Sequence, residues 1–235
     1  MKYIILAAGK GTRLKPLTDD CPKCLYHLDE KTTILQRMIN LIHKYDSDAN
    51  ITVVGGYLFD TLENSAVGCS FIRNPFYEVT NSIASLWFAL EDFNSDVTIM
   101  NGDIVVQEDL VKNIICKKYD NTTVFADSSI RNGDYNIEVS GSNVVVMSKN
   151  LNSFYGEYVG ITKISNEDVK EFKEEIIRMV NNSLYDQWFE SAIVQMIFKK
   201  NFILKYEDVS KYRWTEIDCV DDLVVARQIF ENDAK

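Results

Sequence analysis

The sequence predicts an α/β protein with a mostly parallel central sheet and helices on both of its faces. Short apolar runs, typical of buried parallel strands, alternate with segments whose apolar residues recur at helical spacing. Three of the runs end in glycines or an acidic residue, at positions 9–11, 55–56 and 102–103. Because open α/β sheets bind ligands at the carboxyl ends of their strands, these three ends predict one shared crevice.

The first half of the chain alternates strands with helices. Residues 2–6 are an apolar run, and a helix is predicted over residues 33–45, behind a cap at Thr32-Thr33. The other elements expected in this half are strands over 51–54, 97–100 and 122–126 and helices over 81–92 and 108–118. The β-α-β-α order predicts parallel strands joined by crossover helices.

The second half has a mixed pattern. A hairpin is predicted over residues 136–147, around the turn Gly141-Ser142. Strands are then expected over 158–164 and 203–206 and helices over 167–181, 186–200 and 220–231. The sequence contains no repeat, low-complexity tract or linker rich in proline and glycine, so we predict a single domain over residues 1–235.

Composition restricts the classes of function. The 235 residues are 46% hydrophobic, enough to bury a substantial core, and no apolar segment is long enough to span a membrane. A formal net charge of −10 disfavours a nucleic-acid partner. Five cysteines without a secretion signal predict a reduced, cytoplasmic protein.

The loop after the first apolar run has the features of a phosphate site. Gly9 and Gly11 allow the backbone to approach a polyphosphate closely, and Arg13 and Lys23 add positive charge. The loop is neither a P-loop nor a complete dinucleotide fingerprint. An ordinary turn is the alternative interpretation, but it leaves Arg13 and Lys23 unexplained.

Two aspartates are candidate metal ligands. Asp103 directly follows a buried strand and a glycine, and Asp218 lies where a strand end runs into a helix. Carboxylates at strand ends are suited to Mg²⁺, which takes oxygen ligands. Each residue also has a structural alternative: Asp103 can cap a turn, and Asp218 can cap the helix. Asp221 and Asp222 are better explained as charges at a helix N-terminus.

The stretch Cys21-Pro22-Lys23-Cys24 is formally a C-x-x-C motif. A zinc site would need a second pair of ligands, which His27 and His43 do not supply at a suitable spacing. A redox role would need a thioredoxin-like setting. We therefore treat the motif as part of the phosphate loop.

The complete N-terminal string, from Leu6-Ala7-Ala8-Gly9 through Gly11-Thr12-Arg13-Leu14 to Pro22-Lys23, resembles the signature of the nucleotidyltransferases that build NDP-sugars and CDP-alcohols. That resemblance implies a Rossmann-like mixed, mostly parallel sheet flanked by helices, with a small mixed acceptor-binding subdomain. The stretch Arg73–Leu86 is similar to a segment of the small bacterial phosphocholine cytidylyltransferases and their relatives. The family relationship thus implies a nucleotide-binding half over 1–126 and an acceptor-binding half over 127–235.

The resemblance also implies roles for individual residues. Asp103 and Asp218 would jointly hold Mg²⁺, with Glu216 as a partner. Arg13 and Lys23 would be catalytic: Arg13 suits the departing phosphates through its planar fork, and Lys23 suits the α-phosphate and the acceptor phosphate. The expected nucleotide-binding residues are Leu6, Ala7, Ala8, Gly9, Gly11, Thr12, Arg13, Gly56, Asn81, Ser82 and Asp103.

The second half is rich in aromatic and acidic residues, which proteins use to hold a quaternary ammonium. The expected acceptor-binding residues are Tyr135, Glu157, Tyr158, Trp188, Glu190 and Trp214, although each aromatic residue can equally be a core residue. We therefore expect Mg²⁺-dependent transfer of CMP from CTP to phosphocholine or a similar phospho-amine or phosphonate. The alternatives are a sugar-1-phosphate nucleotidylyltransferase using UTP or dTTP, and a non-catalytic nucleotide-binding module. The partners expected are these ligands alone, with a homodimer left open.

Overall fold

A computed structural model describes residues 1–130, 133–200 and 202–233 of the protein. The range 127–235, expected to form the acceptor half, includes the positions that lie outside the described residues. In the described part, one sheet orders its strands β3-β2-β1-β4-β9-β6-β10-β8-β7. The strands are β1 (Lys2–Ala7), β2 (Asn50–Gly55), β3 (Ser70–Arg73), β4 (Val97–Asn101), β6 (Thr123–Asp127), β7 (Asn136–Ser140), β8 (Asn143–Ser148), β9 (Gly156–Ile164) and β10 (Leu204–Asp208).

Strands β3, β2, β1 and β4 are all parallel, as the alternation of strands and helices predicts. β9 then runs antiparallel to both β4 and β6, and the β7–β8 hairpin closes the far edge. The register pairs Leu6 with Asn101 and Ala7 with Gly55. The ends of three strands therefore meet at one edge of the sheet, which is where the glycine-rich ends predicted a crevice.

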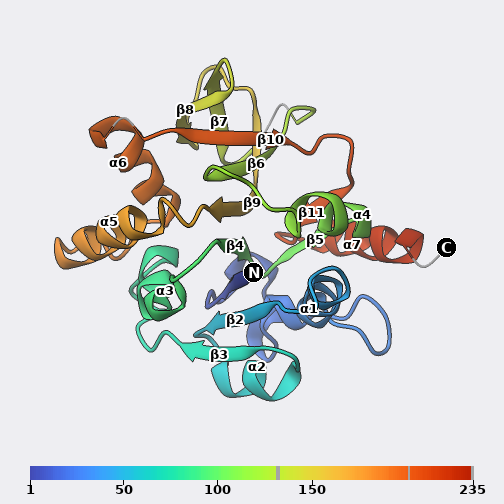
Figure 1. The fold of residues 1–235 in the computed structure, drawn as a ribbon. Coiled ribbons are helices and arrows are strands. Elements are labelled where there is room, and N and C mark those ends of the chain that lie inside the picture. Colours follow the sequence, from blue (N-terminus) through green and yellow to red (C-terminus); the bar gives the residue numbers. More distant parts are fainter. Residues whose placement is uncertain (131–132, 201, 234–235) are drawn as a thin grey trace.

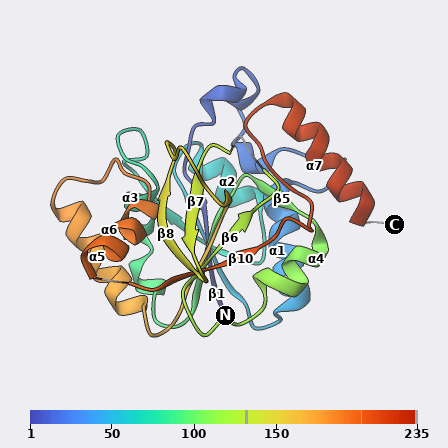
Figure 2. The same ribbon diagram turned by 90° about the horizontal axis from the view of Figure 1, so that it is seen from above.

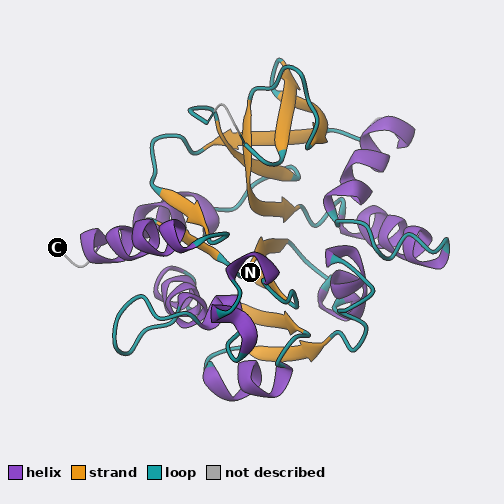
Figure 3. Cartoon of the chain, turned by 180° about the vertical axis from the view of Figure 1, so that it is seen from behind, coloured by secondary structure: helices purple, strands orange, loops and turns teal. Residues whose placement is uncertain are grey.

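Helices cover both faces of this sheet (Figures 1 and 3), and the α/β class is confirmed. Along β1, Tyr3 and Ile5 enter the core that contains α1, α2 and α4, whereas Ile4 enters the core that contains α3, α5 and α6. Figure 2 shows α7 beside the loop that follows β1, where Leu14 and Ala226 share a smaller core. The helices are α1 (Ile34–Tyr45), α2 (Phe59–Ser65), α3 (Ser82–Phe88), α4 (Glu108–Leu110), α5 (Val169–Asn181), α6 (Glu190–Lys200) and α7 (Val220–Asp233).

Three helices differ from the predicted ranges. The helix expected over 81–92 is α3 followed by a 3₁₀ turn at Leu90–Asp92, and the one expected over 108–118 is α4 followed by a π-helical turn at Val111–Ile115. α6 begins at Glu190 instead of position 186, because the carbonyls of Tyr185 and Gln187 accept hydrogen bonds from the N–H groups of Asn81 and Ile83. The patterns above do not predict the short elements α2 and β3.

A second, two-stranded sheet lies apart from the main one. β5 (Ile104–Val106) pairs antiparallel with β11 (Trp214–Glu216), with Ile104 opposite Glu216. This small sheet joins the chain after β4 to the chain before α7. Among the described residues, no helix combines the length and the apolar character needed to cross a membrane.

Candidate active site

The small β5–β11 sheet brings two acidic segments together. The Ile217 N–H donates a hydrogen bond to the Asp103 carbonyl at 3.0 Å, so Asp103 and Asp218 lie side by side although they are far apart in sequence. Carboxylate oxygens of Asp103, Glu216 and Asp218 all lie within 4.8 Å of one another. The structure thus places together the two aspartates expected to bind metal and Glu216, their expected partner.

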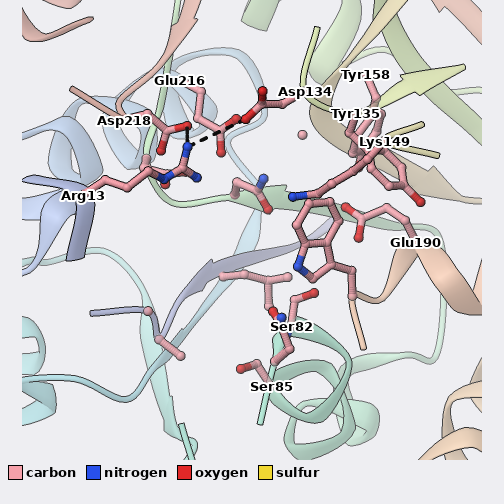
Figure 4. Close-up of a pocket in the computed structure, with 18 of the residues that line it drawn as sticks. Arg13, Ser82, Ser85, Asp134, Tyr135, Lys149, Tyr158, Glu190, Glu216 and Asp218 are labelled. Atoms are coloured by element: carbon pink, nitrogen blue, oxygen red, sulfur yellow. Dashed lines mark hydrogen bonds and ion pairs between the residues drawn. The ribbon is translucent and has the colours of Figure 1, made fainter. Parts of the chain in front are cut away.

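Two cationic side chains contact these carboxylates. The Lys23 Nζ lies 2.9 Å from Asp103 Oδ2 and 2.9 Å from Asp218 Oδ1, and Arg13 Nη1 lies 2.7 Å from Asp218 Oδ2. Figure 4 shows that Arg13 also reaches toward Asp134, whose Oδ2 is 3.7 Å away. Burial opposes the charge of the Lys23 ammonium, but Asp103 and Asp218 outweigh burial and raise its pKa.

Glu216, the third carboxyl group of the cluster, has a raised pKa. Burial, together with the neighbouring Asp103 and Asp218, raises the pKa of Glu216 to about 8. Three carboxylates this close need added positive charge before all of them can ionise. Three oxygen ligands within reach of one point fit a hard divalent cation such as Mg²⁺.

No other cluster of three or more histidine, cysteine or acidic side chains that could hold a metal occurs among the described residues. Cys21 and Cys24 are both free thiols, and Cys24 lies in the core. That the C-x-x-C stretch has neither a zinc nor a redox role stays a prediction from the sequence.

The turn that carries Asp218 is fixed by Asp222. One oxygen of the Asp222 carboxylate accepts hydrogen bonds from the N–H groups of Asp218 and Cys219, at 2.8 and 2.7 Å. A carboxylate in the first turn of α7 satisfies N–H groups that the helix leaves without partners. Asp222 thereby orients the backbone from which Asp218 projects.

The loop after β1 lines a cavity of about 240 Å³ with Ala7, Gly9, Gly11, Thr12, Arg13 and Lys23. Gly11 has a φ of 61°, which a glycine adopts without strain. A Cβ at Gly9 would meet no atom within 4 Å, so packing does not require this glycine. Its lack of a side chain instead leaves the backbone open to a ligand.

A larger cavity of about 350 Å³ adjoins the first, and Leu6, Gly9, Arg13 and Asp103 line both. Ala8, Asn81 and Ser82 also line it. Asn81 caps α3, because its Oδ1 accepts a hydrogen bond from the Ser82 N–H at 2.8 Å.

Gly56 does not line either cavity. A Cβ there would lie 2.5 Å from the Cβ of Tyr77, so this glycine lets Tyr77 pack closely, and it is Tyr77 that faces the larger cavity. Gly56 was expected among the nucleotide-binding residues, but in the structure it lies behind Tyr77 and lines neither cavity.

The opposite end of the larger cavity is aromatic and acidic. Of the residues predicted to bind the acceptor, Tyr135, Glu157, Tyr158, Trp188 and Glu190 line this cavity. The Tyr135 ring centre lies 5.1 Å from that of Trp188 and 6.1 Å from that of Tyr158. Tyr158 is only 6% exposed, so it is largely a core residue.

The two acids at this end have raised pKa values. Burial raises the pKa of Glu190, which is 5% exposed, to about 8. Burial also raises the pKa of Glu157, although the hydrogen bond from the Asp134 backbone N–H opposes this effect. These groups favour a ligand that brings positive charge.

Trp214 lies outside both cavities. Its indole N–H donates to Asp127 Oδ2 at 2.9 Å, and its ring packs against the main core. The structure thus does not bring Trp214 to the acceptor end, because β11 pairs with β5 and turns this side chain toward β6.

Two further residues of the larger cavity escaped the sequence interpretation. Lys149 follows β8 and places its Nζ 3.8 Å from the ring centre of Trp188, and Asp134 pairs with Arg13. Neither residue lies in a motif. Lys149 could have been found only by noticing that a hairpin beside the sheet must end near the predicted acceptor residues.

Ser82 joins the two ends of the site. Its Oγ accepts a hydrogen bond from the Phe189 N–H at 2.9 Å, which ties the start of α3 to the segment that carries Trp188 and Glu190. The position of Trp188 and Glu190 therefore depends on the start of α3.

Known proteins resemble this chain in sequence and in fold. Residues 3–163 match the MobA-like NTP transferase domain. The chain is 28% identical to a CTP:phosphoglutamine cytidylyltransferase of Campylobacter jejuni, over 96% of this chain and 98% of that one. It is 29% identical to a choline-phosphate cytidylyltransferase of Haemophilus influenzae, over 94% of each. The solved CTP:phosphocholine cytidylyltransferase of Streptococcus pneumoniae shares the fold, with a TM-score of 0.78 at 22% identity over 97% and 98% of the two chains.

Proposed function

The chain belongs to the MobA-like NTP transferase family, a family of nucleotidyltransferases, and we propose that it moves CMP from CTP to a small phosphorylated acceptor and releases pyrophosphate. One observation carries this proposal. Lys23 bridges Asp103 and Asp218 where the phosphate-loop cavity meets the larger cavity. A cation and a carboxylate cluster at this boundary suit a reaction between two phosphates.

The reaction joins an oxygen of the acceptor phosphate to the α-phosphorus of the nucleotide, and the bond from that phosphorus to the leaving pyrophosphate breaks. The acceptor is already an anion, so the protein needs no nucleophile of its own. It must align two groups that repel each other and neutralise their charge. Lys23 would serve the α-phosphate and the acceptor phosphate, and Arg13 would serve the departing β- and γ-phosphates.

We propose Mg²⁺ as the metal, held by Asp103, Asp218 and Glu216. When bound, the ion would supply the positive charge that neutralises the phosphates. The same charge would favour the ionised form of Glu216, whose pKa is otherwise raised.

The nucleoside of CTP would lie over Leu6, Ala8 and the start of α3, where Asn81 and Ser82 offer polar atoms. The acceptor would extend toward Trp188 and Glu190. An aromatic and acidic end supports a phosphorylated amine, of the kind that includes phosphocholine, over a hexose 1-phosphate. A homodimer and a cytoplasmic location stay predictions from the sequence.

The test is a substrate panel. The protein is incubated with Mg²⁺, each of the common NTPs and a set of phosphorylated amines, phosphonates and sugars, and pyrophosphate release is measured. We expect release with CTP and a phosphorylated amine or amide. Release with UTP or dTTP and sugar phosphates alone would favour the sugar nucleotidylyltransferase. Nucleotide binding without release for any pair would favour a non-catalytic module.

A further inference from the structure

The aromatic face best placed for an acceptor already carries a cation. The Lys149 Nζ lies 3.8 Å from the ring centre of Trp188, directly over the indole. Figure 4 shows the Lys149 side chain reaching into the cavity toward Glu190. The ammonium thus occupies the place that a quaternary ammonium would need on Trp188.

The other aromatic rings of the cavity are poorly placed to bind a quaternary ammonium instead of Trp188. Tyr158 is 6% exposed, and its hydroxyl bonds to Thr162 at 2.8 Å inside the core. Tyr135 packs between Tyr158 and Trp188, with ring centres 6.1 and 5.1 Å away. A trimethylammonium group would therefore have to displace Lys149, because two cations repel each other at one ring face.

The same end of the cavity also holds an acid. Glu190 is 5% exposed and lines the cavity beside Trp188 and Lys149 (Figure 4). Besides Glu157, the cavity thus presents the Glu190 carboxyl group and the Lys149 ammonium group to the acceptor. The pair formed by Glu190 and Lys149 is complementary to a ligand that carries both charges, with its ammonium at Glu190 and its anionic group at Lys149.

The cavity has room for such a second group. A groove of about 600 Å³ adjoins it, and Tyr135, Lys149 and Trp188 line both. Beyond Lys149 the groove is lined by amide and hydroxyl side chains, by apolar residues and by one acid, among them Met147, Asn150, Asp186, Gln187, Val194 and Gln195. A branch that leaves the acceptor at Lys149 would enter this groove.

Resting on the proposed function, we infer that the acceptor carries an ammonium group and a carboxylate in addition to its phosphate. Lys149 selects this acceptor by binding the carboxylate and by excluding a quaternary ammonium. Lys149 is then a specificity residue that touches a part of the acceptor remote from the reacting phosphate.

Three acceptors built on the same two-carbon amine test this inference. Phosphoethanolamine is the reference, O-phosphoserine adds a carboxylate, and phosphocholine adds three methyl groups to the nitrogen. With CTP and Mg²⁺, we expect kcat/KM to be highest for O-phosphoserine, by roughly tenfold or more over phosphoethanolamine, and lowest for phosphocholine. The variant Lys149→Met keeps an apolar chain over Trp188 and removes the charge. It should bring the kcat/KM ratio of O-phosphoserine to phosphoethanolamine close to one and raise the ratio of phosphocholine to phosphoethanolamine.

The matched control is Lys211→Met, because Lys211 is an exposed lysine that lies over Tyr212, outside both cavities. It should retain the wild-type order of acceptors. Two results overturn the inference: a wild-type preference for phosphocholine, or an equal loss with all three acceptors in Lys149→Met, which would assign Lys149 to the shared phosphate.

Calorimetric measurement of the binding of the three acceptors, in the presence of a non-hydrolysable CTP analogue, separates this inference from the proposed function. A carboxylate preference in binding without any turnover would reject the proposed reaction alone, and binding without that preference would reject the inference.

Discussion

The Lys23 ammonium lies 2.9 Å from Asp103, so one cation is held at the carboxylate cluster by the fold itself. Lys23 is only 13% exposed, and its position follows from the short 3₁₀ turn at Lys23–Leu25. We therefore expect Lys23→Ala to lower kcat for pyrophosphate release by roughly 10²-fold or more, because one preorganised charge at the reacting phosphates is lost.

The control for this variant is Lys10→Ala. Lys10 lies in the same loop but pairs with Glu78 at the surface. Its loss should change kcat by less than about threefold, since exposed ion pairs contribute little. Equal activity of the two variants would remove Lys23 from the mechanism.

Metal dependence should respond to Asp222, although this residue does not belong to the carboxylate cluster. A chelator should abolish pyrophosphate release, and Mg²⁺ should restore it. Asp222→Ala removes the acceptor for the Asp218 and Cys219 N–H groups, so we expect the Mg²⁺ concentration for half-maximal activity to rise by roughly tenfold. Asp222→Asn keeps an acceptor oxygen and should stay closer to wild type. A metal titration in which both variants match the wild type would show that the turn orients itself without this side chain.

Ser82 should matter for stability and for both substrates. Ser82→Ala leaves the Phe189 N–H without its side-chain acceptor, and we expect it to lower the free energy of unfolding by about 1 kcal/mol. The KM values for nucleotide and acceptor should rise together, because the bond links the two ends of the cavity. Ser65→Ala removes a hydroxyl that bonds only within α2 at the surface and should change stability by less than about 0.5 kcal/mol. Urea unfolding that does not distinguish the two variants would contradict this role.

Glu190 should give the protein a measurable pH dependence. Burial raises its pKa in the folded state to about 8, from 4.5 for an exposed glutamate. The folded protein therefore binds this proton more tightly than the unfolded chain does, and the stabilising effect is complete below pH 4.5 and is lost as the pH rises through 8.

Relative to wild type, Glu190→Gln should gain stability as the pH rises across this interval, by up to roughly 1.4 kcal/mol per pH unit. Urea unfolding of both proteins at several pH values within the interval measures the difference. Because Glu216 titrates in both proteins, the comparison isolates Glu190. Curves that stay parallel would mean that Glu190 is already ionised in the folded protein.

The alternation of strands and helices was sufficient to predict the parallel half of the sheet. The family resemblance implied that Asp103 and Asp218 lie together, but the antiparallel pairing of β5 with β11 that brings them side by side was not predicted. The helix boundary at Glu190 could not be predicted either, because it depends on hydrogen bonds from Asn81 and Ile83, which lie far away in the sequence. Trp214 shows the same limit: its residue type suggested an aromatic ligand, but the partner strand of β11 decides which way the ring points.

The pairing of strand β9 with two neighbours limits how the parts of the sheet can move relative to each other. Strand β9 hydrogen-bonds to β4 along one side and to β6 along the other, so it joins the parallel strands to the mixed part of the sheet. The two parts cannot swing apart about a hinge without breaking a ladder of backbone hydrogen bonds in the middle of the sheet. We therefore expect substrate entry and product departure to depend on loops and side chains at the mouth of the cavity, where the exposed Arg13 and Lys149 lie.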